Sequence, residues 1–256
     1  MELRLQTLFV GRQFRVLPTC ASTNAEAQAA EFKNGATPEG LTILAHHQTA
    51  GRGQRGNAWQ APPGENLTFS VVLKPTWLPV ARQFDLSIAV ALAGADALRT
   101  ILGPASPVAV KWPNDLYVGP RKVGGILIEN TLHGAQIGSS VVGIGLNVNQ
   151  LIFDPALPNP TSLAGETGHP HERATVLAVL LESLEARYLA LRAGRNLEQR
   201  AEYRARLYRF GQETTFAFDG RQATGRITGI DARGQLEVQF ANGPRVFGVQ
   251  QVQLVK

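Results

Sequence analysis

The sequence predicts an α+β fold, in which a mixed β-sheet carries helices on one side and a small β-barrel follows at the C-terminus. Three observations support this prediction. Helical and strand-like patterns alternate over the first two-thirds of the chain. The strands expected between residues 108 and 146 follow one another without long crossovers, which favours a mixed or antiparallel sheet. After Gly211 the pattern changes to five short strands, so two domains are expected, at residues 1–210 and 211–256.

Cap and turn residues place the elements of the first domain. Ser22-Thr23-Asn24 offers N-cap side chains for an Ala-rich helix that Gly35 can end. A longer helix is expected at residues 81–102, where Gly103-Pro104 stops it. Strands are expected, in chain order, at residues 41–46, 66–73, 108–112, 116–118, 125–129 and 136–146.

The second half contains a long loop, two helices and the barrel. Residues 150–170 are rich in Pro, Asn and Gly, and such a loop in a compact domain is usually functional or mobile. Helical spacing returns at Glu172, with one apolar stripe formed by Val176, Leu180, Leu184, Tyr188 and Leu191. A second helix fits residues 196–210, with Gly211 as its end. Barrel turns are expected at Asp219-Gly220, 231–234 and Asn242-Gly243, and a bend at Phe247-Gly248.

The composition indicates a folded protein of a reducing compartment. Hydrophobic residues make up 44% and charged residues 18% of the chain, which suits a folded soluble domain and not a disordered one. No apolar run approaches the ~20 residues that span a bilayer, and the N-terminal residues lack the pattern of a signal peptide. The single cysteine, Cys20, cannot form an internal disulfide, so a cytoplasmic location is expected, with Cys20 as a packed residue.

The formal net charge of +5 is distributed unevenly. Residues 195–256 contain ten Arg and Lys against six Asp and Glu, whereas the remainder contains fifteen against fourteen. A basic C-terminal region is compatible with contact to nucleic acid or to an acidic protein. Its basic residues are scattered and are not clustered with aromatic residues, so the sequence favours an ordinary solvated surface. A nucleic-acid-binding barrel remains the alternative from a different functional class.

A loop rich in glycine and arginine, Gly51-Arg52-Gly53-Gln54-Arg55-Gly56, is the first motif with a clear chemical use. Its glycine spacing matches a dinucleotide-binding loop, but residues 57–64 cannot start the regular helix that such a loop requires. No Gly-Lys-Ser/Thr follows the glycines, which excludes a P-loop. Glycines let the backbone approach a ligand closely, and arginines bind phosphate or carboxylate with forked donors. The loop is therefore expected to bind an anion, with a solvated surface loop as the alternative.

Three further segments combine polar groups with strand ends. Lys111-Trp112-Pro113-Asn114-Asp115 leaves a carboxylate at the edge of a turn, although it could be only a β-turn. In residues 121–129, a lysine at a strand start precedes two glycines that let another group pack against the backbone. Residues 143–149, GIGLNVN, end a strand with small residues and two amides, and an amide there can read the edge of an adenine or a ribose.

Together these segments resemble the catalytic domain of bacterial biotin–protein ligases. The family's order and spacing are matched by Ser22-Thr23-Asn24, residues 48–53, 111–117, 122–129 and 143–147, and Thr161-Ser162-Leu163. The resemblance covers essentially the whole chain, including the small barrel. Lipoate ligases share the catalytic fold and an equivalent lysine, and they are the alternative within the same fold. The Gly-Arg-Gly loop after Gln48 and the Trp-Pro-Asn-Asp segment point instead to biotin.

The resemblance implies a class II synthetase-like catalytic domain, an SH3-like barrel and a monofunctional ligase. Such an enzyme uses ATP and Mg²⁺ to convert biotin into biotinoyl-AMP, releases pyrophosphate, and transfers biotin to a lysine. The implied partner is a biotin carboxyl carrier protein of acetyl-CoA carboxylase or of another biotin-dependent carboxylase. Some relatives bind DNA through an N-terminal winged helix, but too few residues precede Ser22 for such a domain. No DNA or membrane partner is expected, and the oligomeric state is left open, with a homodimer as one option.

Site residues follow from the same resemblance. Lys122 and Arg52 are implied as the catalytic cations, with Lys122 bridging the biotin carboxylate and the α-phosphate. Biotin binding is implied for Ser22, Thr23, Asn24, Gln48, Gly51, Arg52, Gly53, Gln54, Lys122 and Gly125. ATP binding is implied for Arg52, Arg55, Trp59, Lys111, Asp115, Lys122 and Asn147, the last at the adenine. Asp115 is a candidate for the phosphate-bound metal or for the incoming amine, and the magnesium ligand is not identified.

Neighbouring histidines do not add a metal site to this prediction. His46 and His47 are adjacent, and on a strand they would face opposite sides of the sheet. The sequence also offers no plausible Ser–His or Cys–His pair. The biotin carboxylate can attack ATP directly, without a covalent enzyme intermediate. The reaction therefore does not require a Ser–His or Cys–His pair.

Overall fold

The structure is a computed structural model that describes residues 3–34 and 37–255. The strands are β1 Phe14–Cys20, β2 Thr42–Gln48, β3 Leu67–Leu73, β4 Val108–Lys111, β5 Asp115–Val118, β6 Arg121–His133, β7 Gln136–Leu146, β8 Glu213–Phe218, β9 Arg221–Ile230, β10 Leu236–Phe240, β11 Gly243–Phe247 and β12 Gln253–Leu254. The α-helices are α1 Thr23–Asn34, α2 Gln83–Leu102, α3 Leu163–Thr167, α4 Arg173–Arg192 and α5 Asn196–Ala205. Two short 3₁₀ turns, η1 Gln54–Gly56 and η2 Val80–Arg82, complete the set. Gly35, which was expected to end the first helix, lies outside the described residues.

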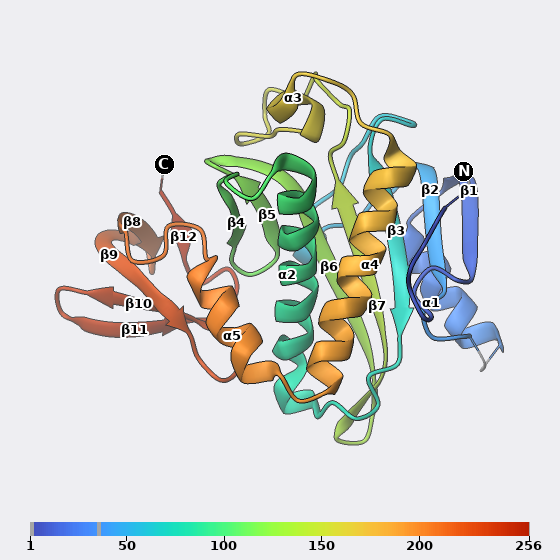
Figure 1. The fold of residues 1–256 in the computed structure, drawn as a ribbon. Helices are drawn as coiled ribbons and strands as arrows, with labels where there is room; N and C mark the ends of the chain where they lie inside the picture. Colours follow the sequence, from blue (N-terminus) through green and yellow to red (C-terminus); the bar gives the residue numbers. More distant parts are fainter. Residues whose placement is uncertain (1–2, 35–36, 256) are drawn as a thin grey trace.

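The larger part of the chain is built on a seven-stranded sheet with the order β1-β2-β3-β7-β6-β5-β4 (Figure 1). Only β1 and β2 run parallel, and the other pairs are antiparallel, which confirms the mixed sheet. The edge strand β1 was not expected from the sequence. It contains Pro18, which cannot donate to a ladder and is tolerated because β1 has a neighbour on one side only.

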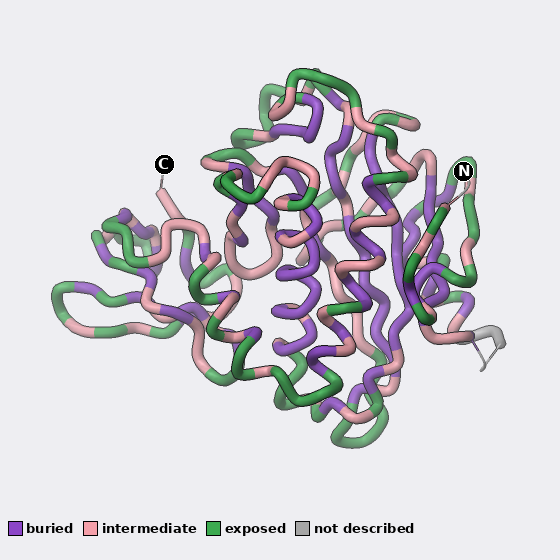
Figure 2. The backbone as a smooth tube through the Cα atoms, viewed as in Figure 1, coloured by how far each residue is buried: buried purple, intermediate pink, exposed green. Residues whose placement is uncertain are grey.

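Helices cover the two faces of this sheet unequally. The long helices α2 and α4 pack together on one face, and Figure 2 shows the middle of α2 mostly buried. Alternate residues of β3, among them Phe69 and Val71, face this main core, whereas Val72 points to the opposite face. There it meets Ala27 and Ala30 of α1 in a small second core. The short helix α1 thus lies opposite the two long helices, where only a single helical layer was expected.

Chain ends and turns differ from the sequence prediction in three places. The helix expected at 196–210 ends at Ala205, because the next residues join the sheet edge: Val110 N donates to Arg206 O and Tyr208 N donates to Val110 O, each at 2.8 Å. The loop at 150–170 contains the short helix α3, whose first turn is capped by the Ser162 hydroxyl. Finally, the turn expected at Asn242-Gly243 lies one residue earlier, at residues 241–242, because β11 already begins at Gly243.

Residues 213–254 form a second, antiparallel sheet with the order β11-β10-β9-β8-β12. In a flat sheet, β8 and β11 would lie about 14 Å apart, three strand spacings. The ring centroids of Phe218 on β8 and Phe247 on β11 are nevertheless 5.1 Å apart, and Phe216 and Phe240 join the same cluster. The sheet must therefore curl strongly around these rings, which confirms the small barrel.

The turn of the barrel at residues 231–234 packs against helices α2 and α5. Arg200 of α5 donates to the carbonyl oxygens of Asp231 and Ala232 and forms an ion pair with the buried Asp85 at 2.7 Å. Gly234 in this turn has a φ of +83° and lies directly against the ring of Phe84. The apolar residues of the barrel accordingly belong to the same hydrophobic core as the main sheet. Within residues 3–34 and 37–255, no helix is long and apolar enough to cross a membrane.

Candidate active site

A cavity of about 620 Å³ lies on the face of the large sheet opposite α2 and extends to the barrel. Most of the site residues predicted from the sequence line it: Ser22, Thr23, Asn24, Gln48, Arg52, Gly53, Gln54, Trp59, Lys111, Asp115, Lys122 and Gly125. They come from the start of α1, from the end of β2 and the loop that follows it, from the end of β4, and from β5 and β6. Segments distant in sequence therefore converge on one cavity.

Two predicted residues are placed differently. Gly51 is not among the lining residues, and an added Cβ atom there would come within 2.3 Å of Trp59 O. Asn147 is buried, and its amide donates to Thr161 O and accepts from the Asn66 amide, so it fastens the loop after β7. Its predicted contact with adenine stays a prediction. The side chain of Arg55 lies outside the described part of the chain.

One end of the cavity is lined by neutral hydrogen-bonding side chains, whose network continues to the Glu129 carboxylate outside the lining. Gln48 Oε1 accepts from Thr23 N at 2.7 Å and from Thr23 Oγ1 at 3.1 Å, which fixes the orientation of its amide. The buried hydroxyl of Ser70 on β3 lies 2.8 Å from Thr23 Oγ1 and 2.6 Å from Asn24 Oδ1. Asn24 Nδ2 in turn donates to Glu129 Oε2 at 2.7 Å. This end is suited to an uncharged ligand group that both donates and accepts hydrogen bonds.

Two glycines on β7 form the floor beside this network. A Cβ atom on Gly143 would come within 2.2 Å of Asn24 Oδ1, and one on Gly145 within 2.3 Å of the Trp59 indole ring. The two residues share a face because strand side chains alternate. Their absent side chains let Asn24 and Trp59 lie directly on the sheet. The Trp59 indole nitrogen is buried and has no hydrogen-bond partner among the described residues.

The cationic side of the cavity is centred on Lys122. Its ammonium group lies 2.7 Å from Asp115 Oδ1, and Gly125, which is paired with Asp115, lies beside both side chains. The turn that carries Asp115 is held to β6, because Asn114 Nδ2 donates to Ile126 O and Ile126 N donates to Asn114 O. This double hydrogen bond fixes the carboxylate next to the lysine.

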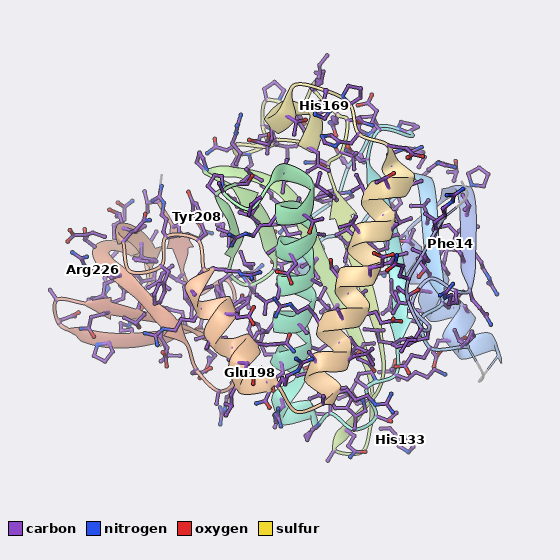
Figure 3. All side chains as sticks on the ribbon, viewed as in Figure 1. Phe14, His133, His169, Glu198, Tyr208 and Arg226 are labelled. Carbon is purple, nitrogen blue, oxygen red and sulfur yellow. The ribbon has the colours of Figure 1, made fainter. Side chains whose placement is uncertain are left out.

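Lys111 adds a second ammonium group next to two tyrosines. Its Nζ atom lies 3.2 Å from Tyr117 Oη. Burial, together with the Asp115 carboxylate, raises the pKa of Tyr117 to about 12, so this hydroxyl stays neutral at physiological pH. The Tyr117 ring packs against Tyr208 with their centroids 5.0 Å apart. Figure 3 shows Tyr208 at the junction between α5 and the barrel.

The segment after α5 and the barrel contribute a wall that the sequence did not predict, including Leu207, Tyr208 and Phe216. Trp112 lines the cavity and donates from its indole nitrogen to Gly234 O at 2.8 Å. The hydroxyl of Tyr203, which is fully buried in α5, lies 3.4 Å from Pro113 O. The segment between Lys111 and Asp115 is thereby held from both sides.

Glu129 and Ser70 are further site residues that the sequence analysis did not single out. Both contact Asn24, and Glu129 also forms an ion pair with Arg52 at 3.0 Å. Glu129 was visible at the end of the 122–129 motif, and alternation along a strand puts it on the same face as Gly125. Ser70 offered a weaker signal, one of two hydroxyl side chains within a largely apolar run.

Comparison with known proteins gives the family. Residues 17–147 match the model of the "Biotin/lipoate A/B protein ligase family", and residues 210–253 match the "Biotin protein ligase C terminal domain". A biotin–[acetyl-CoA-carboxylase] ligase of Paracoccus denitrificans is 34% identical over 236 residues, covering 90% of this chain and 96% of that protein. The chain belongs to the biotin protein ligase family.

Other members of the biotin protein ligase family support the same assignment. A biotin–[acetyl-CoA-carboxylase] ligase of Mycobacterium tuberculosis is 34% identical over 240 residues, covering 92% of this chain and 87% of that protein. A biotin protein ligase of Aquifex aeolicus, solved in complex with biotin and ATP, has a TM-score of 0.79 and 25% identity. The superposition covers 96% of this chain and 99% of that one, barrel included. The family resemblance and the fold are confirmed, and the lipoate-type and nucleic-acid-binding alternatives are not favoured.

Proposed function

We propose that this chain activates biotin with ATP and transfers it to a lysine of a carboxylase carrier protein. The observation that carries the proposal is the division of one cavity into two ends. Thr23, Asn24 and Gln48 offer neutral donors and acceptors for the ureido head of biotin. Lys122 and Arg52 supply cations for its carboxylate and for the α-phosphate of ATP. The orphaned indole nitrogen of Trp59 is a further donor for the bound nucleotide.

The first step joins two anions, which is why the cations matter. A carboxylate oxygen of biotin forms a bond to the α-phosphorus as the bond to pyrophosphate breaks, and biotinoyl-AMP results. Two unit negative charges about 4 Å apart repel by roughly 1–4 kcal/mol for effective dielectric constants of 80 to 20. Lys122, already held by Asp115, and Arg52 offset this repulsion and stabilise the charge that builds up on the phosphate.

Magnesium fits this cavity as an ion that arrives with the triphosphate. Mg²⁺ typically needs only one or two protein carboxylates when phosphates supply further oxygen ligands. Within the described residues no cluster of three or more His, Cys, Asp and Glu side chains could hold a metal, and Asp115 is the only carboxylate of the lining. Asp115 is therefore the residue that would hold the ion, which supplies charge neutralisation at the phosphates.

In the second step, a lysine amine of the carrier attacks the acyl carbon of biotinoyl-AMP. A carbon–nitrogen bond forms, the bond to the AMP oxygen breaks, and the nitrogen loses a proton. The names of the Paracoccus and Mycobacterium relatives make a carrier of acetyl-CoA carboxylase the proposed partner. A cytoplasmic location and the absence of a DNA or membrane partner belong to the same proposal.

The assay that tests this function is ATP–pyrophosphate exchange with biotin and with lipoate as competing acids. Biotin-dependent exchange is expected, together with transfer of biotin to an added carrier protein. Exchange that depends on lipoate but not on biotin would reject the proposal in favour of a lipoate-type ligase.

Gln54 gives a prediction about retention of the intermediate. It lines the cavity as a neutral amide in a loop that also contains Arg52 and Arg55. A charge-assisted hydrogen bond contributes about 1.5–3 kcal/mol, compared with roughly 1 kcal/mol for a neutral one. Gln54→Arg is therefore expected to slow dissociation of biotinoyl-AMP several-fold, measured by stopped-flow displacement. An unchanged dissociation rate in a correctly folded variant would show that Gln54 does not limit retention.

A further inference from the structure

The arginine that is proposed to hold the ligand's anionic groups already has an anionic partner in the protein. Arg52 Nη2 lies 3.0 Å from Glu129 Oε2 on β6. The same oxygen accepts from Asn24 Nδ2 at 2.7 Å, so one carboxylate joins two residues of the cavity lining. The exposed side-chain fractions of 43% for Arg52 and 27% for Glu129 leave the pair accessible to ligand and solvent.

The position of Glu129 is fixed independently of Arg52. Asn24, which donates to it, is buried between the Ser70 hydroxyl and the backbone of Gly143. A second donor bond runs from Asn24 Nδ2 to Leu127 O at 3.3 Å, next to Glu129 on the same strand. Glu129 is thus held by a rigid part of the sheet, whereas Arg52 comes from the loop after β2 and is the more exposed partner.

We propose that Glu129 is an internal counter-ion that competes with the anionic ligand for Arg52. Ligand binding is then an exchange of one anion for another on the same guanidinium group, and ligand release is the reverse exchange. This inference rests on the proposed function, because it takes the carboxylate of biotin and the phosphate of its adenylate as the competing anions. Glu129 acts through Arg52 and is a positioning residue, with no contact to the reacting atoms.

The direction of the effect distinguishes this role from simple support. If Glu129 only oriented Arg52, removing its charge would weaken the binding of an anionic ligand. If it competes for Arg52, removing its charge strengthens that binding. Glu129→Gln keeps the size and an acceptor oxygen for Asn24 and removes only the charge. Because the pair is partly exposed and screened by solvent, the expected gain is about 2- to 5-fold at low ionic strength.

The experiment measures the dissociation constants of biotin and of its uncharged methyl ester, without ATP, by calorimetry on the full-length protein. Glu129→Gln is expected to bind biotin about 2- to 5-fold more tightly and the ester with unchanged affinity. Glu213→Gln is the matched control, because Glu213 pairs with Arg226, which lies on the barrel away from the large sheet (Figure 3). Equal or weaker biotin binding by Glu129→Gln would overturn the proposal.

A double-mutant cycle shows whether the effect passes through the arginine. In an Arg52→Ala background, Glu129→Gln is expected to leave the affinity for biotin unchanged. A gain of the same size in that background would mean that Glu129 repels the ligand directly, which also overturns the exchange. Failure of the proposed function is a separate outcome: it would appear as wild-type protein without biotin-dependent pyrophosphate exchange, whatever the variants do.

Discussion

Lys122→Ala is expected to slow the formation of biotinoyl-AMP by about 100- to 1000-fold, the loss typical when one preorganised charge-stabilising group is removed. Much of the affinity for biotin is expected to remain, because the neutral end of the cavity is untouched. Pyrophosphate exchange measures the first quantity and calorimetry the second. The effect is large because Lys122 is held in place by Asp115 at 2.7 Å before any ligand binds.

Arg121→Ala is the matched control for this variant. Arg121 is the neighbouring cation, but it pairs with Glu166 at 2.8 Å and is not among the residues that line the cavity. Its loss is expected to leave exchange close to the wild-type rate. A folded Lys122→Ala protein with unchanged exchange would remove Lys122 from the mechanism.

Gly234→Ala is expected to have the largest effect on stability. Its φ of +83° is unfavourable for any residue with a side chain, at a cost of about 1–3 kcal/mol. In addition, the new Cβ would lie 2.0 Å from the Phe84 ring, and forcing extra volume into a packed site costs about 1–3 kcal/mol. A total of about 2–6 kcal/mol should appear in denaturant unfolding. Activity should fall as well, because Gly234 O holds Trp112 at the cavity.

Gly220→Ala separates strain from packing. Gly220 also has a positive φ, +70°, but nothing lies within 4 Å of an added Cβ. Only the backbone cost of about 1–3 kcal/mol is expected there, with activity preserved. If both variants lost the same stability, contact between the barrel turn and α2 would contribute little, and the docking described above would be unimportant.

Helix α4 was predictable because its buried residues repeat at helical spacing, and β3 because it is a short apolar run. The apolar stripe from Val176 to Leu191 is buried as expected, and β3 is buried on both faces, in keeping with its apolar run. Strand β1 was missed because only one edge of it is paired and most of its residues are at least partly exposed, so no alternation of hydrophobic residues marks it. The helix from 196 ended early for a tertiary reason: the carbonyl of Arg206 is taken by Val110 of the sheet edge.

The sequence revealed the site residues that belong to recognisable motifs. It did not reveal those that only the fold brings to the site. Lys122, Asp115 and Gln48 belong to recognisable segments, and the structure brings them to one cavity. Trp112 was visible in its motif, but its anchor, a backbone carbonyl of Gly234, has no side chain that a sequence could signal. Asn147 shows the opposite limit: its position in a motif suggested a ligand contact, yet its amide is occupied by Asn66 and Thr161.

The glycines of β7 lower the stability of the main sheet but are required by the arrangement of the site. Gly143 and Gly145 lie in a central strand, between β3 and β6, where a side chain with strand preference would improve folding. Glycine in such a position is less stable than alanine by roughly 0.5–1 kcal/mol, because it loses more backbone freedom on folding. Any Cβ there would displace Asn24 or Trp59. Laboratory evolution for heat resistance is therefore expected to find its gains in α4, the barrel or the surface loops, and to leave this stretch of β7 unchanged.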